Sequence, residues 1–293
     1  MANVNLAIIK KDVVDTVVSK VREFQQKGEL CLPTNYSSEN AMKSAWLLIQ
    51  EVENKDHKMA LDVCTQNSVA NSLLKMAVQG LNPSKNQCYF IVYGNKLVLQ
   101  RSYFGTMHVA KTVEPDVKDI FAQEVYKEDV FEYEISRGTK IITKHSQALA
   151  NVNKSEIVAA YCSILYADGH EETTVMTLDE IKQAWRMSKM NPVTDKGEIK
   201  ADSTHGKFTA MMAKKTVTNR ACGIIVNASD DGNLIVKAFK ETDAEIVEAE
   251  VEAEIAENAN KTFIDVETGE ITDAEPTDEA NQVFEDIAAD DLP

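Results

Sequence analysis

The sequence predicts an α+β fold in which helices back a curved antiparallel sheet of hairpins, with a helical N-terminal region and a disordered acidic C-terminal tail. Two observations predict it. Up to about residue 80 the apolar residues recur at helical spacing, and from residue 88 onward they alternate as in strands. Acidic residues then crowd into the end of the chain. We therefore expect a helical region 1–80, an α+β core 81–240 and a tail 241–293.

The overall net charge of -16 hides this division. Residues 241–293 hold 19 of the 47 acidic residues and a single basic one, Lys261, which is a net charge of -18. The first 240 residues are therefore close to neutral, at +2. A tail with so little apolar bulk cannot bury a core, and it is expected to be disordered.

Three helices are expected in the N-terminal region. Residues 4–27 repeat apolar side chains at helical spacing and stop at Gly28. A second helix is expected over 39–52, after a serine cap, and a third over 66–79, capped by Thr65 and closed by Gly80. The β-branched residues of the first helix lower its intrinsic helicity, so it needs a partner to pack on.

Hairpins follow. CYFIVY and KLVLQRS flank Gly94–Asn95, which is a two-residue turn signature. Further strands are expected within 123–146, turning at Arg137–Gly138, and within 157–177, turning at Asp168–Gly169. The chain then returns to helix over 178–189, which begins with the capping box Thr177/Glu180, and over 207–222, which Gly223 is expected to close.

The segment QRSYFGTMHVAK (100–111) combines cations with aromatic rings, and no acidic residue occurs from Pro83 to Val113. On a helix, Arg101, Phe104, His108 and Lys111 would share one stripe, with Gly105 beside them. Single-stranded nucleic acid needs such a surface, because cations attract phosphates and exposed bases stack on rings. The alternative is that the rings belong to the core and the charges are merely solvated.

A second acid-free segment lies between Asp202 and Asp230. On a helix, its alanines and Val217 form a small-residue face suited to close packing, and its lysines lie beside that face. Two basic stretches in a nearly neutral region favour a shared anionic partner. The cations of this segment are Lys207, Lys214, Lys215 and Arg220, the last of which falls on the other flank and could be structural.

Four segments carry a family resemblance, in collinear order over about residues 20–228: LPTNYSSENAMKSAWL, AVQGLNPSKNQCYFIVYGNKLVLQRSYFGTMHVAKTV, YKEDVFEYE and FTAMMAKKTVTNRA. Together they resemble the RecT single-strand annealing proteins of phages and prophages. In that family a helix ending in Gly-Leu-Asn/Asp-Pro precedes a hairpin and then a Tyr/Gly segment. The segment 191–206 departs from the pattern, since it lacks the Trp that many relatives carry before the last helix.

The resemblance implies a recombination protein, not an enzyme, that binds single-stranded DNA and pairs it with its complement through an annealed duplex intermediate. It implies a homo-oligomer, ring or helical filament, that acts beside a phage 5′–3′ exonuclease in the bacterial cytoplasm. The region 1–80 is the candidate for subunit contacts. Carried over by position, the expected DNA-binding residues are Lys96, Gln100, Arg101, Tyr103, Phe104 and Lys111, with Lys207, Lys214, Lys215 and Arg220 from the last helix. The helical stripe adds His108 to this set.

Several other kinds of site find no support in the sequence. No GxxxxGK[ST] loop is present, so no ATP site is expected. The five cysteines are scattered and the histidines have no partners at zinc-ligand spacing, so neither a disulfide framework nor a zinc site is expected. The acids of DGHEE (168–172) would alternate faces on a hairpin, which favours a solvated turn over a metal site.

No cofactor is required, and Mg²⁺ is expected at most to modulate DNA binding. The apolar runs are too short to span a bilayer.

Two alternatives in function stay open, a metal-dependent nuclease and a protein that coats single strands without pairing them. A nuclease needs clustered carboxylates to hold metal, whereas the strongest segments here contain none. The tail also has two interpretations. It is a solvated acidic spacer, or an acidic arm that competes with DNA or recruits a host single-stranded DNA-binding protein.

Overall fold

The structure is a computed structural model. Contacts divide the chain into two units, Met1–Ala249 and Glu250–Pro293. The structure describes residues 2–153, 156–187, 191–229, 234–245, 262–264 and 271–273, with side chains between Val13 and Glu245.

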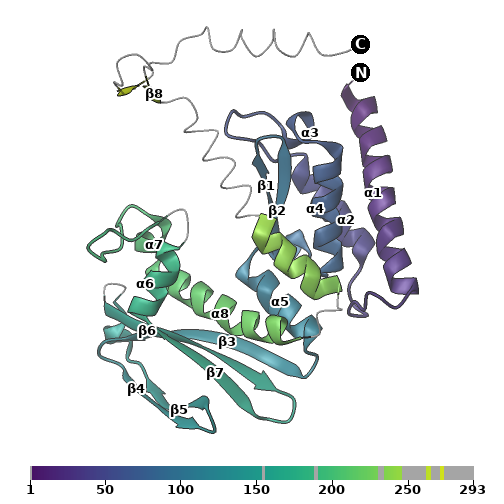
Figure 1. Ribbon diagram of the computed structural model, residues 1–293. Helices are drawn as coiled ribbons and strands as arrows, with labels where there is room; N and C mark the ends of the chain where they lie inside the picture. The colour runs from purple at the N-terminus through teal and green to yellow at the C-terminus, as the bar shows by residue number, and fades with distance from the viewer. Residues whose placement is uncertain are drawn as a thin grey trace. The chain divides into compact units, whose positions relative to one another are not determined.

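The N-terminal region is helical, as predicted (Figure 1). The Thr65 side chain accepts a hydrogen bond from the backbone N–H of Ser68, so it caps the fourth helix as expected. That helix ends before Gly80, whose φ of +66° is the left-handed conformation that glycine adopts without strain. The helices are α1 (Ala2–Gln26), α2 (Ser38–Ile49), α3 (Ala60–Val63) and α4 (Gln66–Val78).

The first hairpin forms where the Gly94–Asn95 turn was expected, and a short helix follows it. The Ser102 side chain caps this helix by accepting a hydrogen bond from the N–H of Gly105. Arg101 lies in the strand, not in the helix, so the prediction of one helical stripe from Arg101 to Lys111 is wrong at its first member. The elements are a 3₁₀ turn η1 (Pro83–Lys85), β1 (Cys88–Tyr93), β2 (Lys96–Arg101) and α5 (Tyr103–Val113).

A five-stranded antiparallel sheet follows, in the order β3-β6-β7-β5-β4. The predicted turns join its hairpins, with positive φ at Arg137, Gly138 and Gly169. This sheet and the helices around it confirm the α+β class. The elements are β3 (Val117–Tyr126), β4 (Val130–Ser136), β5 (Thr139–Ser146), a 3₁₀ turn η2 (Leu149–Asn151), β6 (Ile157–Tyr166) and β7 (Glu171–Thr177).

Helices α6 (Leu178–Arg186), α7 (Thr204–Lys207) and α8 (Thr209–Ala228) complete this part of the chain, and α8 crosses one face of the sheet (Figure 1). The capping box Thr177/Glu180 opens α6 as predicted. The predicted end of the last helix at Gly223 is wrong, because α8 continues to Ala228. A helical glycine costs only about 1 kcal/mol, and the buried side chains of Ile225 and Val226 offset that cost.

One more helix, residues 234–245, was not predicted. It runs across the expected boundary at residue 240, and its side chains Ile235, Val236, Ala238 and Phe239 are buried in the core. The first five residues assigned to the tail therefore belong to the first unit. Of the rest, residues 246–261, 265–270 and 274–293 lie outside the described residues, and in the second unit β8 (Thr262–Ile264) pairs with β9 (Ile271–Asp273).

A single hydrophobic core connects the predicted regions 1–80 and 81–240. It includes Trp46 of α2, Leu99 of β2 and Cys162 of β6, all of which are almost fully buried. Helix α5 lies between the helical end and the sheet end of this unit (Figure 1). Across the described part of the chain, no helix has the length and apolar character that a membrane span needs.

Candidate nucleic-acid interface

A pocket of about 250 Å³ opens where β1, β2, α5 and α8 meet. Both acid-free segments supply side chains to it, which tertiary packing brings together from positions more than 100 residues apart in sequence. Neither an Asp nor a Glu lines it. Its lining residues are Tyr89, Gln100, Arg101, Ser102, Tyr103, Phe104 and Lys215.

Three aromatic rings surround this pocket. Phe104 is 47% exposed, and its ring lies 4.1 Å from that of Tyr103, centroid to centroid, at an angle of 32°. Tyr89 is 50% exposed and pairs across the hairpin with Gln100. Because Phe104 is exposed, the alternative that it is a core residue is wrong. Large rings that stay in solvent are suited to stacking with bases.

Tyr89 is a residue that the sequence analysis missed. Strand β1 alternates between its faces, with Cys88 and Phe90 buried and Tyr89 exposed between them. The same alternation puts Leu99 and Arg101 of β2 on the inner face. Applied to both strands, this period of two would have identified Tyr89 as a surface ring.

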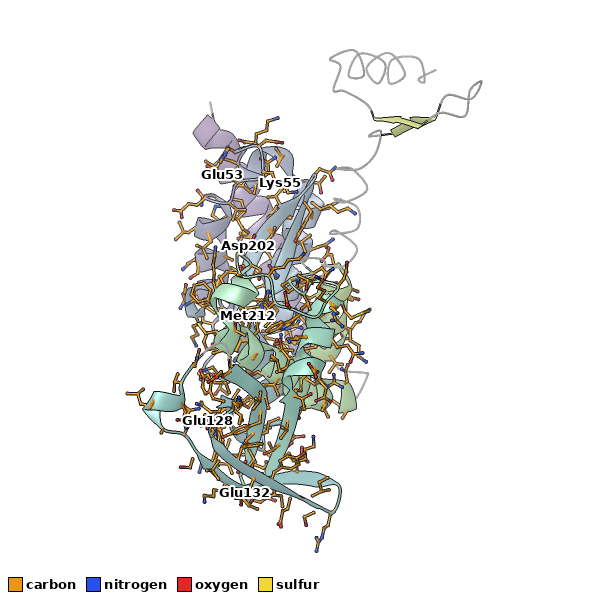
Figure 2. The ribbon with its side chains drawn as sticks, turned by 90° about the vertical axis from the view of Figure 1, so that its left-hand side faces the viewer. Glu53, Lys55, Glu128, Glu132, Asp202 and Met212 are labelled. Atoms are coloured by element: carbon orange, nitrogen blue, oxygen red, sulfur yellow. The ribbon has the colours of Figure 1, made fainter. Side chains whose placement is uncertain are left out.

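Helix α8 extends the surface beyond the pocket. Met211 lies one turn before Lys215 on the same side of the helix, and it is 61% exposed. Phe208, at the start of α8, is 55% exposed. Figure 2 shows the neighbouring Met212 midway between Glu53 at the helical end of the unit and Glu128 at the sheet end. Cations and exposed apolar side chains thus follow one another along this middle part of the unit.

The other cations of this segment differ in their surroundings. Lys214 forms an ion pair with Glu124 of β3, at 2.9 Å between Nζ and the carboxylate, and Glu124 is nearly buried. Lys207 is exposed in α7. Arg220 is exposed farther along α8 and lines a larger pocket of about 970 Å³, which the first pocket adjoins through Arg101.

Arg101 is held by the protein's own acceptors. Its side chain is 4% exposed. Nε donates to Thr106 Oγ1 at 3.3 Å, and Nη1 donates to Gln79 Oε1 at 2.9 Å and to the backbone oxygen of Phe239 at 3.4 Å. Nη2 donates to both carboxylate oxygens of Asp243, at 2.7 and 2.9 Å. All three guanidinium nitrogens therefore have acceptors within the protein in this conformation.

Three more of the predicted DNA-binding residues lie away from the pocket. His108 is half-buried on α5, and this burial lowers its pKa. Lys111, at the far end of α5, contacts the Asp119 carboxylate at 3.3 Å. Lys96 begins β2, and it lies four positions before Gln100 along the strand, which is roughly 13 Å.

A third pocket, of about 410 Å³, lies over β5, β7 and α8. Its lining includes two cations, Lys140 and Arg220, and two acids, Glu172 and Glu180, so it has no excess of positive charge to attract a phosphate. The described residues contain no group of three or more His, Cys, Asp or Glu side chains placed to share a metal ion.

The aromatic pocket therefore combines what single-stranded DNA requires, namely rings for the bases and an adjacent cation for the phosphates. No curated protein matches the sequence significantly. The family model described as the RecT family matches residues 39–259, a span that includes the whole pocket and the helix 234–245. Membership implies single-stranded DNA binding and strand annealing in recombination. On this match over most of its length, the chain belongs to the RecT family.

Proposed function

We propose that this protein anneals complementary DNA strands without ATP, by holding one strand along the surface formed by Tyr89, Phe104, Lys215, Met211 and Phe208. The observation that carries the proposal is the aromatic pocket. Its exposed rings and its cation come from separate acid-free segments and meet in one place. This surface has no reactive group to supply, so its contribution is to concentrate and orient strands.

Stacking and phosphate contacts suit annealing for a physical reason. A ring that stacks on a base face, and a lysine that contacts a phosphate, leave the Watson–Crick edge of that base unoccupied. A held strand can then test incoming strands by base pairing without a sequence preference from the protein. Each stacked base contributes about 1–3 kcal/mol, so a few rings provide useful affinity.

We further propose that the active form is a homo-oligomer that works in the bacterial cytoplasm beside a phage 5′–3′ exonuclease. An exonuclease of that polarity produces the single strands that an annealing protein consumes. A host single-stranded DNA-binding protein is the second proposed partner, and Mg²⁺ is proposed to modulate DNA binding only. Family membership supports these assignments.

One experiment separates the proposed function from its two rivals. Two complementary oligonucleotides, each labelled with one dye of an energy-transfer pair, are mixed with the protein without ATP, with and without Mg²⁺. Energy transfer follows pairing, and a denaturing gel reports strand length. We expect faster pairing of intact strands than in buffer alone.

The rival functions give different results. Shortened strands that appear only with Mg²⁺ would identify a nuclease, and slowed pairing of intact strands would identify a coating protein. Lys215→Ala should reduce the acceleration, because it removes the lysine of the pocket, the cation proposed to contact phosphates. Lys144→Ala serves as the control, because Lys144 is exposed on β5 and does not line that pocket.

A further inference from the structure

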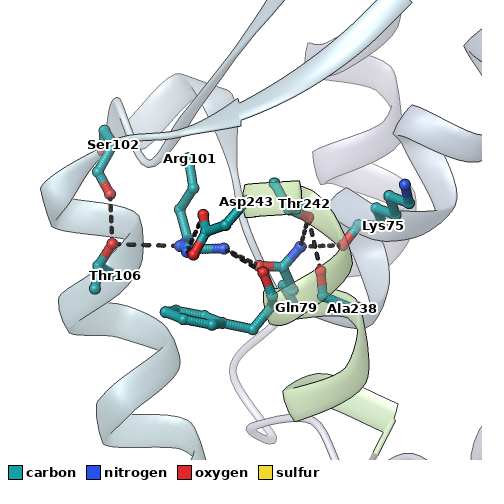
Figure 3. A network of polar contacts seen from close by, with 9 residues as sticks. Lys75, Gln79, Arg101, Ser102, Thr106, Ala238, Thr242 and Asp243 are labelled. Carbon is teal, nitrogen blue, oxygen red and sulfur yellow. Dashed lines mark hydrogen bonds and ion pairs between the residues drawn. The ribbon is translucent and has the colours of Figure 1, made fainter. Parts of the chain in front are cut away.

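The network around Arg101 joins the aromatic pocket to the helix 234–245. Figure 3 shows Arg101 between Thr106 of α5 on one side and Asp243 on the other. The helix packs against the core through apolar side chains, among them the Phe239 ring, whose centroid lies 3.5 Å from the Arg101 guanidinium carbon. It is thus part of the folded unit, although its sequence resembles the start of an acidic tail.

The carboxylate of Asp243 compensates a buried charge. Burial lowers the pKa of Arg101, and the charge and hydrogen bonds of Asp243 oppose that shift. Among the described residues, Asp243 supplies the carboxylate that pairs with this guanidinium. Without it, a buried cation would keep only neutral acceptors, from Gln79, Thr106 and Phe239, which is an unfavourable state.

The other side of Arg101 leads to the aromatic rings. Thr106 Oγ1 accepts from Arg101 Nε and donates to the backbone oxygen of Ser102 at 3.2 Å. Ser102 in turn caps α5 and donates through its own hydroxyl to the backbone oxygen of Asn86 at 2.6 Å. The two residues after Ser102 are Tyr103 and Phe104. The guanidinium therefore braces the helical turn that presents both rings.

A second set of contacts anchors the helix 234–245 to the end of α4. The fully buried Gln79 accepts from Arg101 and donates through Nε2 to Thr242 Oγ1 at 2.9 Å and to the backbone oxygen of Lys75 at 3.0 Å. Lys75 also pairs with Glu245 at 2.6 Å. The Lys75–Glu245 pair holds the helix without touching Arg101, so it offers a matched comparison.

We propose that Asp243 is a positioning residue of the DNA interface: it holds Arg101, and through Thr106 it holds the turn that carries Tyr103 and Phe104. This inference rests on the proposed function, since it assumes that these rings stack on bases. Asp243 itself touches no DNA. Its loss disturbs the rings and leaves the phosphate contacts of Lys215 in place.

The test measures binding of an oligonucleotide that contains 2-aminopurine, an adenine analogue whose fluorescence falls when it stacks. For Asp243→Asn we expect affinity weaker by about 5- to 150-fold, the fold-change that corresponds to one base–ring stack. Fluorescence quenching should fall as well. The slope of log K against log salt should stay at the wild-type value, because no phosphate contact is lost. Asp243→Glu, which keeps the carboxylate, should recover affinity.

Glu245→Gln is the matched control, an acid-to-amide change on the same helix that breaks the pair with Lys75 only. A merely structural role would make the two amide variants alike in affinity and quenching, and that result would overturn the inference. Tighter binding by Asp243→Asn with a steeper salt dependence would also overturn it, since it would mean that Asp243 blocks Arg101 from the phosphates.

A second pair of variants decides the matter if Asp243→Asn does not fold. Thr106→Val removes the hydroxyl between Arg101 and α5, while Thr112→Val removes a similar intrahelical hydroxyl bond, to the backbone oxygen of His108, without touching Arg101. Only Thr106→Val should weaken binding and quenching, and equal effects would overturn the inference. A wild-type protein that does not bind the oligonucleotide would instead refute the proposed function.

Discussion

Replacing Gly105 by alanine tests whether close packing, not helix propensity, governs the turn that carries the aromatic rings. Gly105 lies in the first turn of α5 and is buried. A Cβ atom there would lie 2.1 Å from the backbone oxygen of Gln87 and 2.8 Å from Arg101 Cγ. The sequence pattern placed Gly105 beside the predicted stripe. In the structure the backbone of Gln87 packs against this position.

The expected loss follows from these distances. The Gln87 oxygen would have to retreat by about 0.9 Å to reach 3.0 Å, a separation below which real contacts of this kind are essentially absent. Such overpacking typically costs about 1–3 kcal/mol. The same oxygen accepts the Ser102 N–H at 3.0 Å, and weakening that bond adds about 0.5–1.5 kcal/mol. Helix propensity returns about 1 kcal/mol for the change to alanine. The net loss is about 0.5–3.5 kcal/mol.

Thermal unfolding at one fixed protein concentration measures this loss, because assembly would make the midpoint depend on concentration. For a unit of this size, about 1 kcal/mol shifts Tm by about 2–4 °C, so Gly105→Ala should lower it by several degrees. Gly223→Ala is the matched control, since nothing lies within 4 Å of a Cβ in the middle of α8. It should raise Tm through helix propensity alone. A Gly105→Ala protein at least as stable as the wild type would refute the steric reasoning.

Three further predictions concern binding and pH. Phe104→Ala should weaken single-stranded DNA binding by about 1–3 kcal/mol at an unchanged salt slope, and a changed slope in a salt titration would contradict a stacking role. Lys215→Ala should reduce that slope by about 1, and an unchanged slope would mean that Lys215 contacts no phosphate. The pKa of His108 is lowered by burial and by the charge of Lys85, against an opposing hydrogen bond with the Gly80 backbone. The unfolded chain therefore binds a proton first as the pH falls below about 6.5, so stability present above that pH is lost on acidification. Urea unfolding measured at pH 7.5 and at pH 5.5 should show that His108→Gln loses less folding stability on acidification than the wild type does. An equal loss of stability would mean that His108 does not contribute to this pH dependence.

Much of the fold could be predicted because its signals are local. The capping box of α6, the glycine after α4 and the two-residue turns of the hairpins depend on residues close together in the chain. The basic segments were also visible, and Gln100, Tyr103, Phe104 and Lys215 meet as members of one pocket. Whether these side chains contact DNA stays a prediction.

The helix 234–245 shows where charge composition misled the prediction. Its acids resemble those of the tail, but Ile235, Phe239 and Thr242 recur at helical spacing and are buried. That apolar period, weighed against composition, would have extended the folded region past residue 240. Nothing in the sequence would have paired Asp243 with Arg101, which lies 142 residues earlier.

The family, the α+β class and the two acid-free segments follow from the sequence alone, because each depends on residue type and near-neighbour spacing. Which cations are buried or paired depends on tertiary packing. Arg101 and Lys215 both lie in acid-free segments and line the same pocket, yet the Arg101 side chain is 4% exposed and paired with Asp243, while Lys215 is only half-buried. The physical reason is that a side chain's exposure depends on the element packed over it, and that element can come from anywhere in the chain.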